Sequence, residues 1–286
     1  MEIRIDPNLV VLGPLVLTWH GLFSAVGLGA GIWIAVRLLR GSPVSEDEVM
    51  TTAFWGTVGA LIGARLLHVL DQWEYYRQQP WQILLINEGG IAIFGAIIGG
   101  VLGGFVYVRL RRLPMGLLAD AAAVGLILGQ AIGRIGDVIN GEHHGQRVPE
   151  GTPWAVVYTH PNTLGERGVP NHLAVGYELV WDLLVYGVLL GLWGRLPRSG
   201  MLFWLYLLLY SGGRFVISFF RQDTLTPLGL TQAQVVALGC AAVAVWCLVY
   251  LFTRAAREPL PAPLQPPAER ALGPTPPPSP REPAAR

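Results

Sequence analysis

Four polar side chains are spaced along the stretch GQAIGRIGDVINGEHHG, residues 129–145, in a pattern that could do chemistry. Asp137, Asn140 and Glu142 follow Arg134 at offsets of three, six and eight. The stretch begins as glycine-spaced apolar helix and ends in polar turn residues, so it runs from membrane depth into water. Ionisable groups at that depth are costly, about 2.5–3.5 kcal/mol for an arginine on insertion scales, and usually mark a functional site. An arginine whose side chain only extends to the membrane–water interface would not need these three partners, so we interpret the stretch as a functional site.

Two further arginines interrupt apolar runs. Arg65 lies in GARLLHVL, and Arg214 lies in YSGGRFVISFFRQD, seven residues before Arg221 and on the same helix face. Embedded guanidinium groups need anions, which they bind in a bidentate manner. Glu178 and Asp182 could supply such anions, and so could the phosphate of a lipid that enters from the bilayer. Recognition of a phosphate-bearing lipid is therefore one chemistry that this pattern allows.

The composition indicates the class of protein that must hold these residues. Hydrophobic residues make up 52% of the 286 positions and charged residues only 14%, which is the profile of a polytopic membrane protein. The net charge of +1 gives no indication of a nucleic-acid partner. Cys240 and Cys247 lie seven apart in one apolar run, so they share a helix face and cannot form a disulfide with each other.

Seven apolar runs are each near the ~20 residues that cross a ~30 Å hydrocarbon core. They cover residues 15–39, 49–70, 91–108, 115–135, 173–193, 201–220 and 234–252. The first run is too long for a signal-peptide core and has no cleavage site before its arginines, so we expect it to be retained. These runs predict an all-α polytopic membrane protein in which residues 1–257 form a domain of seven transmembrane helices.

Two segments are expected to lie outside the membrane helices. A loop segment at about residues 136–172 separates the fourth and fifth helices, on the outer face of the membrane. Residues 258–286 are too rich in proline to pack a core, and we interpret them as a disordered cytoplasmic extension.

Arginine placement predicts how the bundle is oriented. Arginines gather at 37–40, 109–112, 195–198 and 254–257, which all fall on one side of a seven-helix bundle. Short loops rich in arginine stay in the cytoplasm. We therefore expect the N-terminus outside and the C-terminus in the cytoplasm, with Arg134 and Arg214 near the outer face.

Glycines recur every four residues on two of the expected helices. One row is Gly95, Gly99 and Gly103, with Gly100 and Gly104 beside it, and the other row is Gly125, Gly129 and Gly133. Such faces of small residues let helix backbones approach closely, so they predict tight helix packing.

The segment GRIGDVINGEHHG resembles the signature of the prolipoprotein diacylglyceryl transferases, whose usual form is G-R-x-G-N-F-x-N-x-E-x-x-G. The resemblance extends over nearly the whole bundle, through WHGL at 19–22, GARLLHVL at 63–70, NEGGIAIFGAIIGG at 87–100, NHLAVGYE at 171–178 and YSGGRFVISFFRQD at 210–223. Seven helices with the N-terminus outside also agree with this family, and that topology follows here from hydropathy and arginine placement alone.

The resemblance implies an enzyme of lipoprotein maturation in the bacterial cytoplasmic (inner) membrane. It would transfer diacylglycerol from phosphatidylglycerol to the lipobox cysteine of a preprolipoprotein and release glycerol phosphate. Its partners would be phosphatidylglycerol, lipobox peptides and membrane lipids, with no nucleic acid, cofactor or metal. By the match, Arg134 would bind the lipid phosphate, Arg214 would lie at the reaction centre and Glu142 would accept hydrogen bonds. The remaining residues implied in the substrate pocket are Asp137, Asn140, Gly145, Arg65, Tyr210 and Arg221.

Four positions depart from the family's usual residues and change the candidate base. The sequence has Phe94 for the usual histidine, Ser218 for a glutamate, Asp137 for an asparagine and His20 for a tyrosine. The reaction needs a thiolate, and a thiol of pKa about 8.5 is mostly protonated at neutral pH. We name His20 as the expected catalytic base, because a neutral imidazole is the natural base near pH 7. A carboxylate, or one of the adjacent outer-loop histidines 143 and 144, would be the alternative.

Other classes of function differ in how well they match the sequence. A homologue that has lost the chemistry and only binds phospholipid or lipoprotein precursors is the second interpretation of the same signature. A transporter is disfavoured because the chain has no internal repeat or paired broken helices, and an intramembrane serine protease because no G-x-S-G motif occurs. A metal site at His143 and His144 is disfavoured, since adjacent side chains rarely chelate one ion and no third ligand follows at metal spacing.

The orientation can be tested with topology reporters. A reporter fused after Arg257 should be active only as a cytoplasmic marker, and one inserted near Thr163 only as an external marker, because the arginine-rich loops stay inside. Paired alkaline phosphatase and fluorescent-protein fusions at both positions would measure this. The opposite pattern at either position would invert the predicted bundle.

Overall fold

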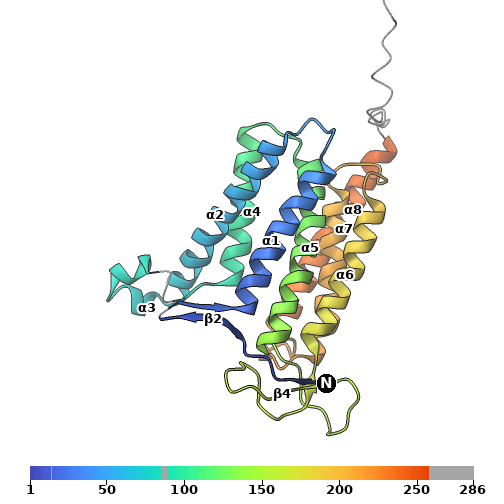
Figure 1. Cartoon of the computed structure of the whole chain (residues 1–286). Coiled ribbons are helices and arrows are strands. Elements are labelled where there is room, and N and C mark those ends of the chain that lie inside the picture. Colours follow the sequence, from blue (N-terminus) through green and yellow to red (C-terminus); the bar gives the residue numbers. More distant parts are fainter. Residues whose placement is uncertain (14, 86–88, 258–286) are drawn as a thin grey trace, which may run out of the picture.

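The computed structural model describes residues 1–13, 15–85 and 89–257. Seven long helices lie side by side (Figure 1): α1 (Trp19–Leu38), α2 (Glu46–Asp71), α4 (Ile93–Leu110), α5 (Met115–Asn140), α6 (Ala174–Leu192), α7 (Met201–Ile217) and α8 (Gln232–Arg257). All seven are long and apolar enough to cross a membrane, which confirms the predicted all-α polytopic architecture. The expected extension at 258–286 lies outside the described residues, as do positions 86–88, which include the first two residues of the NEGG segment.

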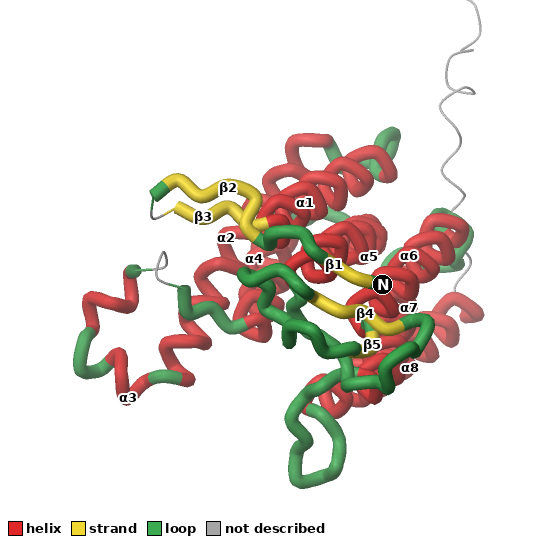
Figure 2. The backbone as a smooth tube through the Cα atoms, turned by 60° about the horizontal axis from the view of Figure 1, so that its bottom comes forward, coloured by secondary structure: helices red, strands yellow, loops and turns green. Residues whose placement is uncertain are grey.

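One end of the bundle carries the N-terminus and the short elements (Figure 2). These are the strands β1 (Glu2–Ile3), β2 (Asn8–Leu12), β3 (Leu15–Thr18), β4 (Ala155–Tyr158) and β5 (Asn171–His172), the helix α3 (Trp73–Tyr76) and the 3₁₀ helices η1 (Pro80–Leu84) and η3 (Ser218–Phe220). β1 pairs parallel with β4, and β4 pairs antiparallel with β5, while β2 and β3 form a separate antiparallel hairpin. The last described turn of α8 lies at the opposite end of the bundle (Figure 1), as an odd number of helices requires.

The first membrane helix begins later than its apolar run. The prediction of a helix from Leu15 is wrong at its start, because Leu15–Thr18 pairs with β2 as strand β3 across a turn at Gly13 (φ 59°). Helix α1 begins at Trp19, where the Thr18 hydroxyl accepts a hydrogen bond from the Gly21 amide at 3.1 Å and caps the first turn. His20 therefore lies in the first turn of α1, at the end of the bundle that carries the strands.

The fourth membrane helix ends later than predicted. Helix α5 passes the predicted end at Ile135 and continues to Asn140. It stops at Gly141, which adopts the left-handed conformation (φ 78°) that glycine tolerates best at a helix end. Asp137 and Asn140 are therefore held on a rigid helix, and the outer loop segment expected from about 136 begins only at Gly141.

The glycine rows pack helices in two pairs, as their spacing predicts. A Cβ atom added at Gly63 of α2 would lie 2.9 Å from the Cα of Gly99 on α4, and one added at Gly31 of α1 would lie 2.6 Å from the carbonyl oxygen of Gly125 on α5. These approaches leave no space for a side chain. Gly133 is the exception, because a Cβ there would meet nothing within 4 Å.

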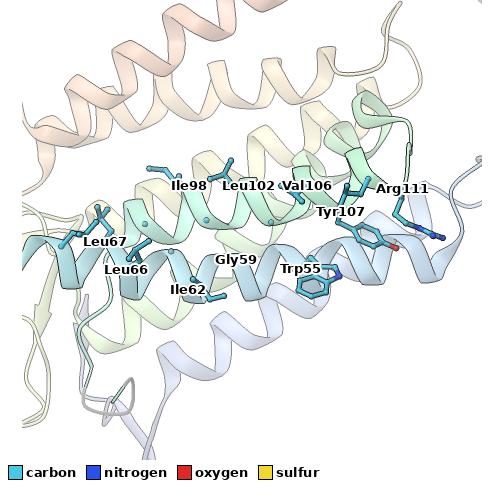
Figure 3. Close-up of a pocket in the computed structure, with 16 residues that line it drawn as sticks. Trp55, Gly59, Ile62, Leu66, Leu67, Ile98, Leu102, Val106, Tyr107 and Arg111 are labelled. Carbon is cyan, nitrogen blue, oxygen red and sulfur yellow. The ribbon is translucent and has the colours of Figure 1, made fainter. Parts of the chain in front are cut away.

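An apolar groove of about 750 Å³ follows the contact between α2 and α4 (Figure 3). Ile62 and Leu66 of α2 and Ile98 and Leu102 of α4 flank the groove, and each is more than half exposed in the isolated chain. Exposed apolar side chains of this kind suit a surface that faces lipid. None of the site residues named from the sequence lines the groove.

The buried apolar core is centred on α5. Val124 and Ile127 have no exposed surface, and they pack in one cluster with Leu189 of α6 and Leu202 of α7. A second cluster joins Leu39, directly after α1, to α2, α4 and α5 at the end of the bundle away from the strands. The polar C-terminal turns of α5 therefore directly follow the best-packed part of this helix.

The glycine packing predicts a specific loss of stability. Replacing Gly99→Ala should lower the free energy of unfolding by about 1–3 kcal/mol, because the added methyl group would overlap the backbone of α2. The measurement is thermal unfolding of the purified protein in detergent. The matched control is Gly29→Ala on α1, where a Cβ meets nothing within 4 Å and a better helix former should not destabilise. Equal unfolding temperatures for both variants would contradict the packing.

Candidate active site

Three arginines share one buried carboxylate where α5, α6 and α7 come together. Glu178, in the second turn of α6, has a side chain that is only 5% exposed. Its Oε2 lies 2.9 Å from Nη2 of Arg134, and its Oε1 bonds to Nη1 of Arg214 and lies 3.4 Å from Nη1 of Arg221. The anionic partner expected for Arg134 and Arg214 is therefore present within the chain.

Local structure explains how Arg221 joins Arg214 at the same carboxylate. Helix α7 ends at Ile217 and tightens into the 3₁₀ turn η3, where the Ser218 hydroxyl donates to the Arg214 carbonyl at 2.7 Å. The chain then extends, and Arg221 forms an antiparallel bridge with Gly145. The Arg221 guanidinium also contacts Asp223, with Nε 3.0 Å from Oδ2.

A second carboxylate connects α5 to the start of α1. Asp137 accepts a hydrogen bond from Nη1 of Arg134 at 2.9 Å, and the two residues are three apart on one face of α5. The other carboxylate oxygen of Asp137 lies 2.6 Å from Nδ1 of His20. The contact requires glycine at position 136, because a Cβ there would lie 2.6 Å from the His20 Cα atom. Two of the four departures from the family pattern, His20 and Asp137, thus touch each other.

The turn after α5 adds a third group of polar residues. Asn140 is 2% exposed, and its amide nitrogen donates to Oε1 of Glu142 at 3.0 Å. Gly145 is enclosed, since a Cβ atom there would lie 2.5 Å from the His172 carbonyl oxygen and 2.8 Å from that of Phe220. We call Asn140, Glu142 and Gly145 the wall residues, and a carboxylate oxygen of Glu142 lies within 4.8 Å of ligand atoms of His20 and Asp137.

The cluster keeps hydrogen-bonding capacity for a ligand. Arg134 Nε is buried and has no partner among the residues that the structure describes, and of the Arg214 donors only Nη1 meets a carboxylate there. Buried polar atoms without partners are rare, so each needs an explanation. An anion placed between these two guanidinium groups would satisfy both.

Arg65 has a different role from the other arginines. Its guanidinium donates five hydrogen bonds of 2.6–3.1 Å, all to backbone carbonyls in η1 or in the described residues between η1 and α4. The expectation that Arg65 needs an anion is wrong, because carbonyl oxygens of residues 82–85 and 89–90 converge on it instead. Local spacing could not show that convergence.

Burial shifts the pKa values of His143 and Tyr158 in the segment that follows α5. Desolvation, and then the Arg221 guanidinium, lower the pKa of His143, which sits in the left-handed region (φ 54°) and is neutral at pH 7. Burial raises the pKa of Tyr158 to about 12, so its hydroxyl stays protonated and donates to the Val138 carbonyl at 2.8 Å.

Three side chains in the site have the spacing of metal ligands. Atoms of His20, Asp137 and Glu142 that could bind an ion all lie within 4.8 Å of one another. Contacts within the site already account for the positions of these side chains. His20 contacts Asp137, and Glu142 accepts a hydrogen bond from Asn140. In the sequence, only the adjacent His143 and His144 suggested a metal site, and this group left no such pattern.

Two site residues were missed or undervalued in the sequence. Glu178 was named only as one possible counter-ion, although it contacts three arginines, and Asp223 was not singled out as a site residue. The available signal was the i to i+4 pair of Glu178 and Asp182 within an apolar run. Tyr210, which the sequence did name, lies one turn before Arg214 on α7, with its ring 6.0 Å from that of Tyr206.

Comparison with known proteins assigns the family. A family model described as prolipoprotein diacylglyceryl transferase matches residues 7–250. The chain belongs to this family. A phosphatidylglycerol–prolipoprotein diacylglyceryl transferase from Dehalococcoides mccartyi is 40% identical over 250 residues, covering 87% of this chain and 95% of the relative. Relatives of the same name from Nostoc sp. and Symbiobacterium thermophilum are 38% and 36% identical, over 89% of this chain and 92% and 96% of their own lengths.

The match to the prolipoprotein diacylglyceryl transferase family covers the whole charged cluster. Residues 7–250 include His20 on α1, the signature stretch on α5, Glu178 on α6 and Arg221 after α7. The transferase family is thus assigned over the same residues that build the site.

The central position of Glu178 predicts a large stability effect. Replacing Glu178→Gln should lower the free energy of unfolding by about 3–5 kcal/mol, because it leaves buried guanidinium charges without their counter-ion. Thermal unfolding in detergent measures the effect. The control is Glu166→Gln, which breaks an exposed pair with Arg147 and should leave the unfolding temperature unchanged. A Glu178→Gln protein as stable as this control would show that the arginines are not held by Glu178.

Proposed function

We propose that this protein transfers the diacylglyceryl group of phosphatidylglycerol to the cysteine thiol of a preprolipoprotein lipobox, forming a thioether and releasing glycerol phosphate. The names of its relatives state this donor and this acceptor for those proteins. The observation that carries the proposal for this chain is the pair Arg134 and Arg214, which share one carboxylate while Arg134 Nε has no partner among the described residues. Such a pair suits a phosphate that must leave as an anion.

The chemistry is a displacement at a saturated carbon. The thiolate sulfur forms a bond to the glycerol carbon of the diacylglyceryl group, and the carbon–oxygen bond to the phosphate breaks. The departing oxygen takes the bonding electrons, so negative charge builds up on the phosphate. Donors that are already fixed where this charge develops stabilise the transition state more than mobile water does.

Arg134 and Arg214 are the residues that would meet the phosphate. Guanidinium groups bind phosphate oxygens in a bidentate manner, and Glu178 fixes their positions before the lipid arrives. Arg221, in contact with both Glu178 and Asp223, would keep the site's charge balanced as the phosphate enters.

The wall residues would select the lipid's head group. The glycerol head of phosphatidylglycerol carries hydroxyl groups, which need polar partners when they leave water. Asn140 has a buried Oδ1 with no partner in the described part of the chain, and Glu142 offers carboxylate oxygens beside it. Gly145 would let the chain that follows these residues lie directly against the carbonyl groups of His172 and Phe220, and Tyr210 would border the pocket from α7.

The reaction would take place at the outer face of the bacterial cytoplasmic membrane. Arginine placement predicts that the loops at the other end of the bundle are cytoplasmic. The site lies at the end that carries the N-terminus and the strands, where α5 and α7 end and α6 begins. A lipobox cysteine emerging from the membrane on that side would reach it.

Replacement of Arg134 tests the proposed phosphate contact. Arg134→Ala should abolish thioether formation on a lipobox peptide in phosphatidylglycerol vesicles and reduce the phosphatidylglycerol retained on purification, because a charge-assisted contact is lost in a low-dielectric site. Arg134→Lys should also fail, since an ammonium group cannot reproduce the planar fork. Mass spectrometry of the peptide and of bound lipid measures both effects.

The control for this test is Arg147→Lys, which alters an exposed arginine paired with Glu166 and should keep full activity. Full activity of Arg134→Lys would mean that the residue supplies only a charge. A wild-type protein that fails to lipidate a lipobox reporter in cells depleted of their own transferase would refute the proposed function.

A further inference from the structure

The His20 imidazole has the surroundings of a proton acceptor. Its Nδ1 lies 2.6 Å from Oδ1 of Asp137, whose other oxygen accepts from Arg134 at 2.9 Å. An ionised carboxylate can only accept hydrogen bonds, so the ring proton belongs on Nδ1. The second ring nitrogen, Nε2, then carries a lone pair, and it has no hydrogen-bond partner in the part of the chain that the structure describes.

Burial differs sharply between the two partners. The Asp137 side chain is 5% exposed, whereas that of His20 is 42% exposed. The carboxylate is therefore shielded from solvent and fixed from behind by Arg134, while the imidazole can be reached. A buried carboxylate behind a reachable imidazole fixes the tautomer and stabilises the imidazolium that forms when the ring takes a proton.

The backbone is built to hold this pair together. Thr18 caps the start of α1 and so fixes the first helical turn, which contains His20. Gly136 lets that turn lie directly against α5, one residue before Asp137. Farther along, Gly27 and Gly31 of α1 pack on Gly129 and Gly125 of α5, which fixes the register of the two helices.

We propose that His20 and Asp137 form a dyad in which His20 Nε2 accepts the proton of the lipobox cysteine thiol and Asp137 orients the ring. The inference rests on the proposed diacylglyceryl transfer. His20 is the catalytic residue of the dyad, and Asp137 is a positioning residue that acts through it.

The proton and electron balance of the step is complete without a further reactant. The S–H proton moves to Nε2, and the sulfur electron pair forms the new C–S bond. The pair of the broken C–O bond stays on the phosphate oxygen. The imidazolium then gives its proton to the released glycerol phosphate or to water, so His20 returns to its neutral form.

Other titratable groups face the same space. Asp137, Glu142 and Arg134 act on His20 electrostatically, and His143 lies near the same three residues. Glu142 already accepts a hydrogen bond from Asn140, and His143 lacks a carboxylate partner in the described residues. His20 is therefore distinguished by the carboxylate that orients it.

The experiment compares thioether formation by wild type and His20→Gln in phosphatidylglycerol vesicles as the pH is raised. At neutral pH the variant should lose about 10²- to 10⁴-fold in rate, the usual contribution of a positioned base. The deficit should shrink as the pH approaches the thiol's own pKa of about 8.5, because the thiolate then forms without a base. A purely structural defect would not depend on pH in this way.

Further variants separate a base from a folding defect. Asp137→Asn should show the same pH-dependent deficit, and the double variant should be no slower than His20→Gln alone, since groups that act as a unit are not additive. Added imidazole should partly restore His20→Ala. His143→Gln should leave the pH dependence of the rate unchanged, and phosphatidylglycerol retention by His20→Gln should match that of wild type.

The possible failures can be told apart. An active wild type whose His20→Gln variant shows no deficit, or one that is equal at every pH, would overturn the dyad and leave the proposed transfer standing. A wild type that retains phosphatidylglycerol but forms no thioether would overturn both. Loss of wild-type activity on treatment with a chelator would assign His20, Asp137 and Glu142 to a metal ion and overturn the dyad.

Discussion

The site depends on one electrostatic constraint, which is that three guanidinium groups next to a membrane interior must share a counter-charge. Glu178 meets that constraint by contacting Arg134, Arg214 and Arg221 from a side chain that is almost fully buried. Taking such charges out of water is favourable only when they are well paired, so the cluster ties the polar ends of α5, α6 and α7 to one arrangement. The same sharing leaves Arg134 Nε without a partner among the described residues, and under the proposed function this donor would meet the lipid phosphate.

Apolar packing delivers the charged groups to this point. Glycine-to-glycine contacts bring α1 against α5 and α2 against α4, while the core around Val124 and Ile127 joins α5 to α6 and α7. Helix α5 takes part in both the glycine contacts and the apolar core. Its last two turns lie where this tight packing ends and polar side chains begin. Gly136 has a local role at this boundary, because it lets His20 reach Asp137. The proposed dyad is thus a consequence of backbone proximity as much as of side-chain chemistry.

Hydropathy and length were enough to predict the seven helices, because crossing a membrane imposes both on each segment. The signature stretch was also recognisable, since Arg134, Asp137, Asn140 and Glu142 are spaced along one helix and its following turn. The start of α1 was mispredicted because Leu15–Thr18 is as apolar as the helix that follows, and only its pairing with β2 makes it a strand. Long-range partners were the other limit. Neither the five carbonyls around Arg65 nor the three arginines around Glu178 leave a local pattern in the sequence.

The most direct test of this account is an experimental structure of the protein in nanodiscs that contain phosphatidylglycerol. A lipid phosphate should lie within hydrogen-bond distance of Arg134 Nε and of the Arg214 donors other than Nη1, with the glycerol carbon to be attacked on the side that His20 Nε2 can reach. Glu178 should keep its contacts with the arginines in the lipid-bound state. A phosphate bound elsewhere in the protein, with Arg134 Nε still without a partner, would contradict the central claim that this cluster is the site of diacylglyceryl transfer.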